Sequence, residues 1–332
     1  MLVDASTTRP TPDKRGNDVA SLPLVSIGLP TYNSGSLVGQ LLDSVVAQDY
    51  PNIEVVIADD CSSDNTAEVC RRYAEKYPFI AFHQNPANLG RVGNFLNALG
   101  KCSGEFVIWG DHDDQYAPTF ISELVAALLA RPGAVGAQGV IETRDNSGNL
   151  QRLVRLEGAS SPNNQTPWQL AASLVRAHRA RLRVKNNLLI HGVLRRSALL
   201  ETIRAYPGLC VSERFWLAQM ALAGPFVYVD KLLYFRTKVP TQGRYDNEAT
   251  DPFHKRTFGP LQTYLIAMQL GVSIARSRIV PLRRKPYAVL LPATYLWDVW
   301  MGSASRQLNR LRQGLPDPLV RRLRRVKQRL SR

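Results

Sequence analysis

Residues 24–141 alternate between short apolar runs and segments with helical periodicity, and this alternation restricts the fold more than any other feature. The apolar runs lie at 24–30, 53–58, 79–84, 106–110 and 134–141. They are largely continuous, as in strands buried on both faces of a sheet. A helix-like segment follows each of the first four runs. The pattern predicts an α/β fold with a mostly parallel sheet covered by helices on both faces.

The pattern loosens after about residue 142. A polar hairpin (142–157) is expected first, and then a loop rich in Pro, Asn and Ser (158–167). A helical C-terminal extension is expected at the end of the chain. We therefore predict a disordered lead-in, a domain in two halves and this extension, with bounds at 1–21, 22–141, 142–250 and 251–332.

The net charge of +15 is placed unevenly, because residues 302–332 hold ten Lys or Arg and one acidic residue. Apolar side chains recur there along one helical face, at Leu319, Leu323, Val326 and Leu330. A basic amphipathic tail of this kind is typical of helices that lie on anionic membranes. A solvated helix that packs its leucines on the domain is the alternative. Aromatic residues are absent from the tail, so no nucleic-acid partner is expected.

Four cysteines without CxxC spacing favour a reducing compartment. The longest apolar stretch, at 287–301, is interrupted by Pro292 and Asp298 and is too short to span a bilayer. No signal peptide is visible in residues 1–21. We expect a cytoplasmic protein. Peripheral attachment to the cytoplasmic face of the membrane is the alternative.

The ends of the predicted strands carry the residues expected to bind a ligand. Ligands of open α/β sheets bind at the carboxyl ends of the strands. The residues at these ends are Pro30, Thr31, Tyr32, Asn33, Asp59, Asp60, Asp111, His112, Asp113 and Asp114, with Gly90 and Arg91 in the loop before the third helix. On sheet geometry, all of them would converge on one crevice.

Three carboxylates crowd into the sequence D-H-D-D at 111–114. Like charges repel, and a bound divalent cation would offset the repulsion. Asp111 and Asp113 are two positions apart, so both can face one Mg²⁺ or Mn²⁺. A nitrogen from His112 would favour Mn²⁺. A solvated acidic loop that caps the next helix is the alternative.

Several common enzyme classes lose their main sequence support. The chain has no GxxxxGK[ST] loop, no GxGxxG after a strand and no GxSxG turn. A DxDx[TV] nucleophile motif is also absent, which disfavours a phosphatase. These absences leave a divalent-cation site as the main interpretation of the acidic strand ends.

Two stretches resemble a known family. They are VSIGLPTYNSGSLVGQLLDSVVAQDYPNIEVVIADDCSSDNT (25–66) and NPANLGRVGNFLNALGKCSGEFVIWGDHDDQYAP (85–118). Both resemble the opening of the family 2 inverting glycosyltransferases, which have the GT-A fold. The resemblance is strong over 24–120 and extends weakly to 240.

The resemblance implies a nucleotide-sugar donor, with a UDP-sugar expected first. Thr31 and Tyr32, with Pro30 and Asn33 beside them, would line the nucleotide pocket. Asp59 would accept a hydrogen bond from the base edge, and the neighbouring Asp60 would shape the same loop.

The acidic loop and the loop before the third helix would hold the rest of the donor. Asp111 and Asp113 match the family's D-x-D pair, which contacts the ribose and the Mg²⁺ or Mn²⁺ ion. Arg91 would pair with the nucleotide or the diphosphate. Gly90 would allow close backbone approach, or serve only as a turn glycine.

Inversion requires a general base that deprotonates the acceptor hydroxyl. The resemblance places it at Glu213, eleven residues before Gly224. The sequence departs from the family's E-D pair, because Ser212 replaces the first acid and Glu replaces Asp. A helix-capping acid is the alternative reading, and Asp230 is the reserve candidate for the base.

The acceptor side would involve His191, Gly192 and Asp114. A lone His in an apolar run is equally well explained as a core histidine. Trp109 and Trp216 could stack on a sugar, but their apolar contexts favour core packing.

The resulting hypothesis is a metal-dependent inverting glycosyltransferase acting on a hydroxyl of a glycan or a lipid-linked acceptor. One rival is a non-catalytic protein that binds polyanions or nucleic acid through the basic tail. The other rival is a nucleotidyltransferase, although GLPTYNSG (28–35) is not its G-x-G-x-R loop.

Overall fold

The computed structural model describes residues 22–145, 147–156, 161–175, 189–204, 213–238, 260–297 and 299–300. Residues 213, 214, 238 and 260–263 are described by their backbone only. The expected lead-in at 1–21 and the basic tail at 302–332 lie outside the described residues.

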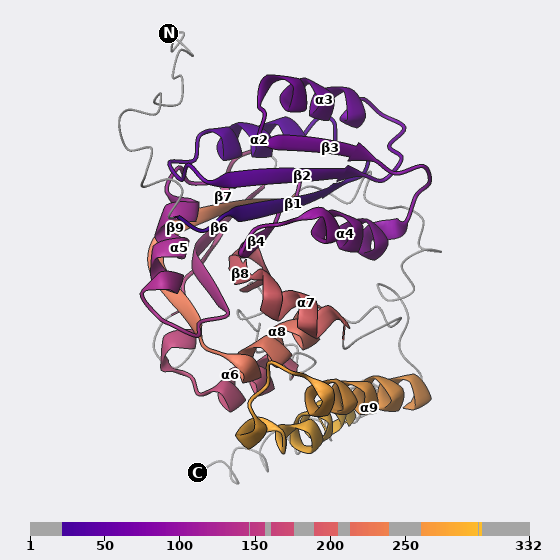
Figure 1. The fold of residues 1–332 in the computed structure, drawn as a ribbon, viewed down its shortest axis with the longest axis vertical. Coiled ribbons are helices and arrows are strands. Elements are labelled where there is room, and N and C mark those ends of the chain that lie inside the picture. The colour runs from indigo at the N-terminus through magenta and orange to yellow at the C-terminus, as the bar shows by residue number, and fades with distance from the viewer. Residues whose placement is uncertain are drawn as a thin grey trace, which may run out of the picture.

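Four parallel strands form the first half of the sheet, as predicted. They run in the order β3-β2-β1-β4, and Figure 1 shows β1, β2 and β3 pointing the same way. The strands are β1 (Val25–Thr31), β2 (Ile53–Asp59), β3 (Ile80–Gln84) and β4 (Phe106–Trp109). The helices that connect them are α2 (Val38–Val46), α3 (Thr66–Lys76) and α4 (Gly90–Lys101).

The second half of the sheet is mixed and continues in the order β4-β8-β6-β9-β5, with β7 paired to β6. β6 and β9 pair parallel, whereas β5, β7 and β8 each pair antiparallel. The strands are β5 (Asp114–Tyr116), β6 (Gly136–Asp145), β7 (Leu150–Val154), β8 (Val193–Arg195) and β9 (Phe226–Lys238). The helices of this half are α5 (Phe120–Leu129), α6 (Pro167–Val175), α7 (Arg196–Arg204) and α8 (Glu213–Ala223).

The polar hairpin predicted at 142–157 is present as the end of β6 and β7. A short 3₁₀ helix (Pro162–Asn164) lies in the predicted loop. Strands β5 and β8 have three residues each, which is too short to produce a periodic signal. Sequence analysis therefore missed both.

The sheet is buried on both faces, which is why its strands read as continuous apolar runs. On one face, Ile27 and Ile57 pack with α2, α3 and α5. On the other, Val56 and Val107 pack with α4, α6, α7 and α8. This two-faced burial bears out the predicted α/β class.

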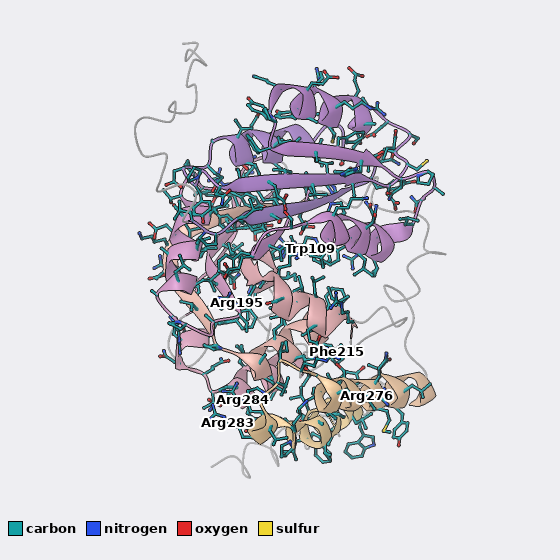
Figure 2. The ribbon with its side chains drawn as sticks, viewed as in Figure 1. Trp109, Arg195, Phe215, Arg276, Arg283 and Arg284 are labelled. Atoms are coloured by element: carbon teal, nitrogen blue, oxygen red, sulfur yellow. The ribbon has the colours of Figure 1, made fainter. Side chains whose placement is uncertain are left out.

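Trp109 and Trp216 belong to the second core, as their apolar contexts indicated. The Trp109 ring stacks on Phe95 with centroids 3.4 Å apart, and Trp216 is 6% exposed. Figure 2 shows Trp109 between the sheet and the helices below it. Both side chains serve packing in this structure.

The last described part of the chain is helical. It consists of α9 (Pro260–Arg276), a 3₁₀ helix, η4 (Leu282–Arg284), and a helix at 287–297. In the described part of the chain, no helix combines the length and apolarity needed to cross a membrane.

Candidate functional site

The carboxyl ends of β1, β2 and β4 meet at one edge of the sheet, because β1 lies between the other two. Neighbouring strands are ~4.8 Å apart, so the ends of β2 and β4 are about 10 Å from each other. Two groups of acids stand at these two ends: Asp59 and Asp60 after β2, and the acidic loop after β4. Two acidic regions thus lie about 10 Å apart at the same edge.

The loops after β1 and β2 are tied together by polar contacts. The Thr31 hydroxyl donates to Asp59 Oδ1 over 3.3 Å. Asn33 N donates to Ser62 Oγ at 3.0 Å, and Asn33 Oδ1 accepts from Ser63 N at 2.9 Å. Asn33 has a φ of 46°, which an Asn tolerates better than most residues. These bonds hold the two loops in one arrangement.

Asp59 and Asp60 are both fully buried. Asp59 Oδ2 accepts from Ser62 N at 3.2 Å and from the Gln84 amide at 3.0 Å. Asp60 Oδ1 accepts from the Asn85 amide at 2.9 Å and from Leu89 N at 2.7 Å. Asp60 Oδ2 has no hydrogen-bond partner among the described residues. A buried acceptor without a donor is costly, so Asp60 is the acid of this pair with hydrogen-bonding capacity left over.

Buried asparagines connect these loops to α4. The Asn94 amide donates to Thr31 O at 3.2 Å and to Ala58 O at 2.9 Å. Asn94 Oδ1 accepts from the Asn85 amide at 2.9 Å. Sequence analysis did not single out Asn85 or Asn94. Asn85 could have been found, because it directly follows β3, and polar residues that directly follow the other strands were taken as candidates for ligand binding.

Gly90 begins α4 with a φ of 75°, a conformation that costs other residues energy. Its N–H donates to Asn88 Oδ1 at 2.9 Å. The backbone therefore accounts for Gly90 as a turn glycine. The Arg91 side chain is exposed, while Pro30 and Tyr32 are half-buried next to the end of β1.

The acidic loop turns sharply between β4 and β5. Asp114 N donates to Asp111 O at 3.0 Å, which closes the turn. Asp111 and Asp113 remain half-exposed, whereas Asp114 is 1% exposed. Asp114 is the first residue of β5 and lies opposite Arg236 of β9.

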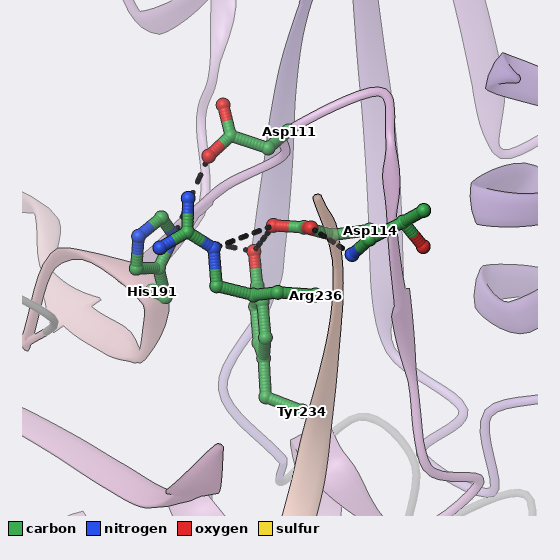
Figure 3. Close-up of polar contacts among 6 residues, drawn as sticks. Asp111, Asp114, His191, Tyr234 and Arg236 are labelled. Carbon is green, nitrogen blue, oxygen red and sulfur yellow. Dashed lines mark hydrogen bonds and ion pairs between the residues drawn. The ribbon is translucent and has the colours of Figure 1, made fainter. Parts of the chain in front are cut away.

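Asp114 is held by residues of β9 (Figure 3). Its Oδ2 accepts from the Tyr234 hydroxyl at 2.6 Å and lies 3.9 Å from Arg236 Nε. The Tyr234 hydroxyl is also 3.2 Å from His191 Nδ1, which lies 3.5 Å from Asp111 Oδ2. Asp111, Asp114 and His191 are thereby brought together, and sequence analysis missed Tyr234 and Arg236.

Burial sets the protonation of this cluster. Burial lowers the pKa of His191 to about 4, although Asp111 opposes the shift. The imidazole is therefore neutral at physiological pH. Burial, with Asp111 and Asp113 nearby, raises the pKa of Asp114 well above its usual value. Arg236 and the Tyr234 hydroxyl oppose this rise of the Asp114 pKa, and a bound divalent cation would oppose it further.

The cluster has a donor set that fits a divalent cation. One ligand atom from each of Asp111, Asp114 and His191 lies within 4.8 Å of the other two. Carboxylate oxygens suit Mg²⁺ or Mn²⁺, and a neutral imidazole nitrogen favours Mn²⁺ of the two. Asp113, the second ligand expected from sequence, is not a member of this three-residue group.

The candidates for the general base have different surroundings. Helix α8 begins at Glu213, but the Glu213 side chain lies outside the described residues. Asp230 is 59% exposed and forms an ion pair with Arg155 at 3.0 Å. Asp230 thus takes part in an exposed ion pair next to β7.

Gly192 has a packing reason to be glycine. An added Cβ would lie 2.0 Å from the carbonyl oxygen of Ala137, which belongs to β6. No side chain fits there without a backbone shift. Gly192 thus lets the segment after His191 approach the sheet closely.

Comparison with known proteins identifies relatives of this chain. Residues 26–191, half of the chain, match the family described as "Glycosyl transferase family 2". An uncharacterized glycosyltransferase of Rickettsia felis is 37% identical over 108 residues, which are 32% of this chain and 17% of that protein. The poly(ribitol-phosphate) beta-N-acetylglucosaminyltransferase TarS of Staphylococcus aureus is 36% identical over 126 residues, 35% of this chain and 22% of TarS. The chain thus matches less than a third of either relative.

Solved structures share the fold over more of the chain. S. aureus TarS 1-349 in complex with UDP-GlcNAc has a TM-score of 0.56 and 21% identity, covering 83% of this chain and 72% of that one. The mannosyltransferase PcManGT from Pyrobaculum calidifontis, in complex with GDP-Man and Mn²⁺, has a TM-score of 0.52 and 20% identity. The match covers 93% of this chain and 81% of that one.

Proposed function

The chain belongs to glycosyl transferase family 2 and has the GT-A fold, and on this premise we propose that it transfers a sugar from a nucleotide donor. The acceptor is a hydroxyl of a glycan or a lipid-linked saccharide, and the reaction inverts the anomeric centre. The observation that carries the proposal is the pairing of two acidic groups on either side of β1. One is the buried pair Asp59 and Asp60, and the other is the cluster at Asp111.

The loops after β1, β2 and β3 would bind the nucleoside. Tyr32 is half-buried beside the end of β1 and would form a wall of this pocket, with Pro30, Thr31 and Asn33 around it. Asp59 would accept a hydrogen bond from the base edge, and Asp60, whose Oδ1 accepts from Asn85 and Leu89 N, would shape the same loop. Arg91 is exposed at the start of α4 and would reach toward the diphosphate.

Asp111, Asp114 and His191 would hold the divalent cation, with Asp113 beside them. The two structural relatives differ in the bound sugar nucleotide, which is UDP-GlcNAc in TarS and GDP-Man, with Mn²⁺, in PcManGT. A UDP-sugar with Mn²⁺ is our first choice for this chain. A bound cation would neutralise part of the charge on the departing diphosphate.

The transfer step breaks the bond between the anomeric carbon and the diphosphate oxygen. The acceptor oxygen forms the new bond from the opposite face and loses its proton. We assign the role of the general base, which accepts this proton, to Glu213 at the first turn of α8. His191 and Asp114 would border the acceptor, because they share the cluster with Asp111.

The basic tail at 302–332 would hold the protein on an anionic membrane, where a lipid-linked acceptor is available. The protein would then act at the cytoplasmic face of the membrane. The domain halves 22–141 and 142–250 would supply the donor side and the acceptor side.

Calorimetry with nucleoside diphosphates tests the proposed donor site. We expect UDP or GDP to bind the full chain at least about tenfold more tightly with Mn²⁺ than without it, because the cation bridges the acids and the diphosphate. A chain that binds only through its basic tail would take up polyanions without this metal dependence. That result would refute the donor site and favour the non-catalytic rival.

A further inference from the structure

Two helices at the C-terminal end of the described chain form a pair. They are α9 and the helix at 287–297, which residues 299–300 continue; we call them the helical pair. Both bury apolar side chains in the same core, including Leu270 of α9 and Leu291 of the second helix. An added Cβ at Gly271 would lie 2.6 Å from the carbonyl oxygen of Ala288. The helices therefore touch, and their outer faces adjoin.

The outer faces of the helical pair are apolar. Eight large apolar side chains on them are 44–73% exposed: Tyr264, Leu265, Met268, Val272, Val289, Leu290, Trp297 and Trp300. Those of α9 are spaced i, i+1, i+4 and i+8, which places them on one side of the helix. Exposed apolar groups of this extent are uncommon on a protein that has no binding partner.

Trp297 and Trp300 form the aromatic part of this surface. Both rings are 60% exposed, and their centroids are 5.4 Å apart. Trp is enriched at the boundary between lipid and water, because its ring is apolar and its N–H can bond to a headgroup. Core packing does not account for two exposed tryptophans side by side.

The charge around the helical pair is mainly positive. Residues 260–300 contain five basic residues and one acidic residue, Asp298. Arg284 and Lys285 donate to the backbone carbonyls of Leu222 and Ala275, each at 2.7 Å. Arg276, Arg278 and Arg283 are exposed. Figure 2 shows Arg276 and Arg283 at this end of the molecule, away from the strands.

We propose that the outer face of the helical pair docks on the surface of an anionic lipid bilayer. A bilayer satisfies both properties of this face, since it buries the apolar side chains and places anionic headgroups next to the arginines. A second copy of the chain would bring the same positive charges together. The docking is independent of the transferase activity and of residues 302–332.

Vesicle co-sedimentation of the full chain tests the docking, with vesicles of phosphatidylcholine alone or mixed with phosphatidylglycerol. The variant Leu265→Glu/Met268→Glu removes two apolar groups from the face. The matched control is Leu150→Glu/Leu153→Glu on β7, where the leucines are 60% and 46% exposed. Both variants change the net charge equally.

We expect the unmodified chain and the β7 control to bind the anionic vesicles. The α9 variant should bind them at least about tenfold more weakly. Equal binding by the two variants would overturn the proposal. A chain that is dimeric without lipid and becomes monomeric in the α9 variant would also overturn it, because the face would then join two copies.

Tryptophan fluorescence gives a second readout that does not depend on a charged variant. Lipids brominated in their chains should quench the unmodified protein when it binds. The variant Trp297→Phe/Trp300→Phe should still bind but lose most of this quenching, since Trp216 is buried and Trp109 and Trp168 are partly buried against the core. Unchanged quenching in that variant would show that the pair does not enter the bilayer.

Discussion

Asp111→Asn is expected to lower the rate of donor turnover by about 10²- to 10³-fold, because a cation ligand is lost. Asp111 Oδ2 lies 3.5 Å from His191 Nδ1 and is half-exposed, so it is the accessible acid of the cluster. The concentration of Mn²⁺ that gives half-maximal rate should rise in the same variant. Release of the nucleoside diphosphate at saturating donor, over a range of Mn²⁺, measures both effects.

Glu123→Gln is the matched control for this substitution. It also neutralises one acid, but Glu123 belongs to a surface ion pair between α5 and Lys231. We expect it to keep the rate of the unmodified chain. If Asp111→Asn retains both the rate and the Mn²⁺ dependence of the unmodified protein, the cation does not bind at this cluster.

Glu213→Gln is expected to reduce turnover by about 10²- to 10⁴-fold while leaving the affinity for the donor nearly unchanged. A general base acts on the proton of the attacking hydroxyl and not on the bound nucleotide. The glutamine has the same size but does not accept a proton. Steady-state turnover and donor binding by calorimetry, measured on one preparation, separate the two quantities.

Glu68→Gln is the control for Glu213→Gln, because both glutamates lie in the first turn of a helix. Glu68 is in the first turn of α3, as Glu213 is in that of α8, so both variants remove an acid that favours a helix N-terminus. The control should retain its rate. Normal turnover by Glu213→Gln would show that another group takes the proton, and Asp230 would be the next residue to test.

The parallel half of the fold was predictable because its strands are buried on both faces. Ile27 and Val56 point into opposite cores, and such strands are apolar throughout. The mixed half was predictable only in part. The apolar run at 134–141 and the polar hairpin correspond to β6 and β7. Strands β5 and β8 are only three residues long, and β9 pairs with β5 across more than a hundred residues of chain.

In the candidate site, too, local sequence patterns identified some residues, and long-range strand pairing brought in the others. Asp59, Asp60 and Asp111 were found because they follow predicted strands directly. Tyr234 and Arg236 reach Asp114 only through the pairing of β5 with β9, which no local pattern reveals. The sequence predicted Asp111 and Asp113 as cation ligands, and folding adds Asp114 and His191 as potential ligands next to Asp111.

Incubation of the purified full chain with a panel of sugar nucleotides tests the proposed transferase activity most directly. In the presence of Mn²⁺, we expect slow hydrolysis of at least one UDP- or GDP-sugar, with release of the nucleoside diphosphate and loss of activity when the metal is chelated. No turnover of any sugar nucleotide, together with release of pyrophosphate from a nucleoside triphosphate and a sugar phosphate, would contradict the account and identify a nucleotidyltransferase.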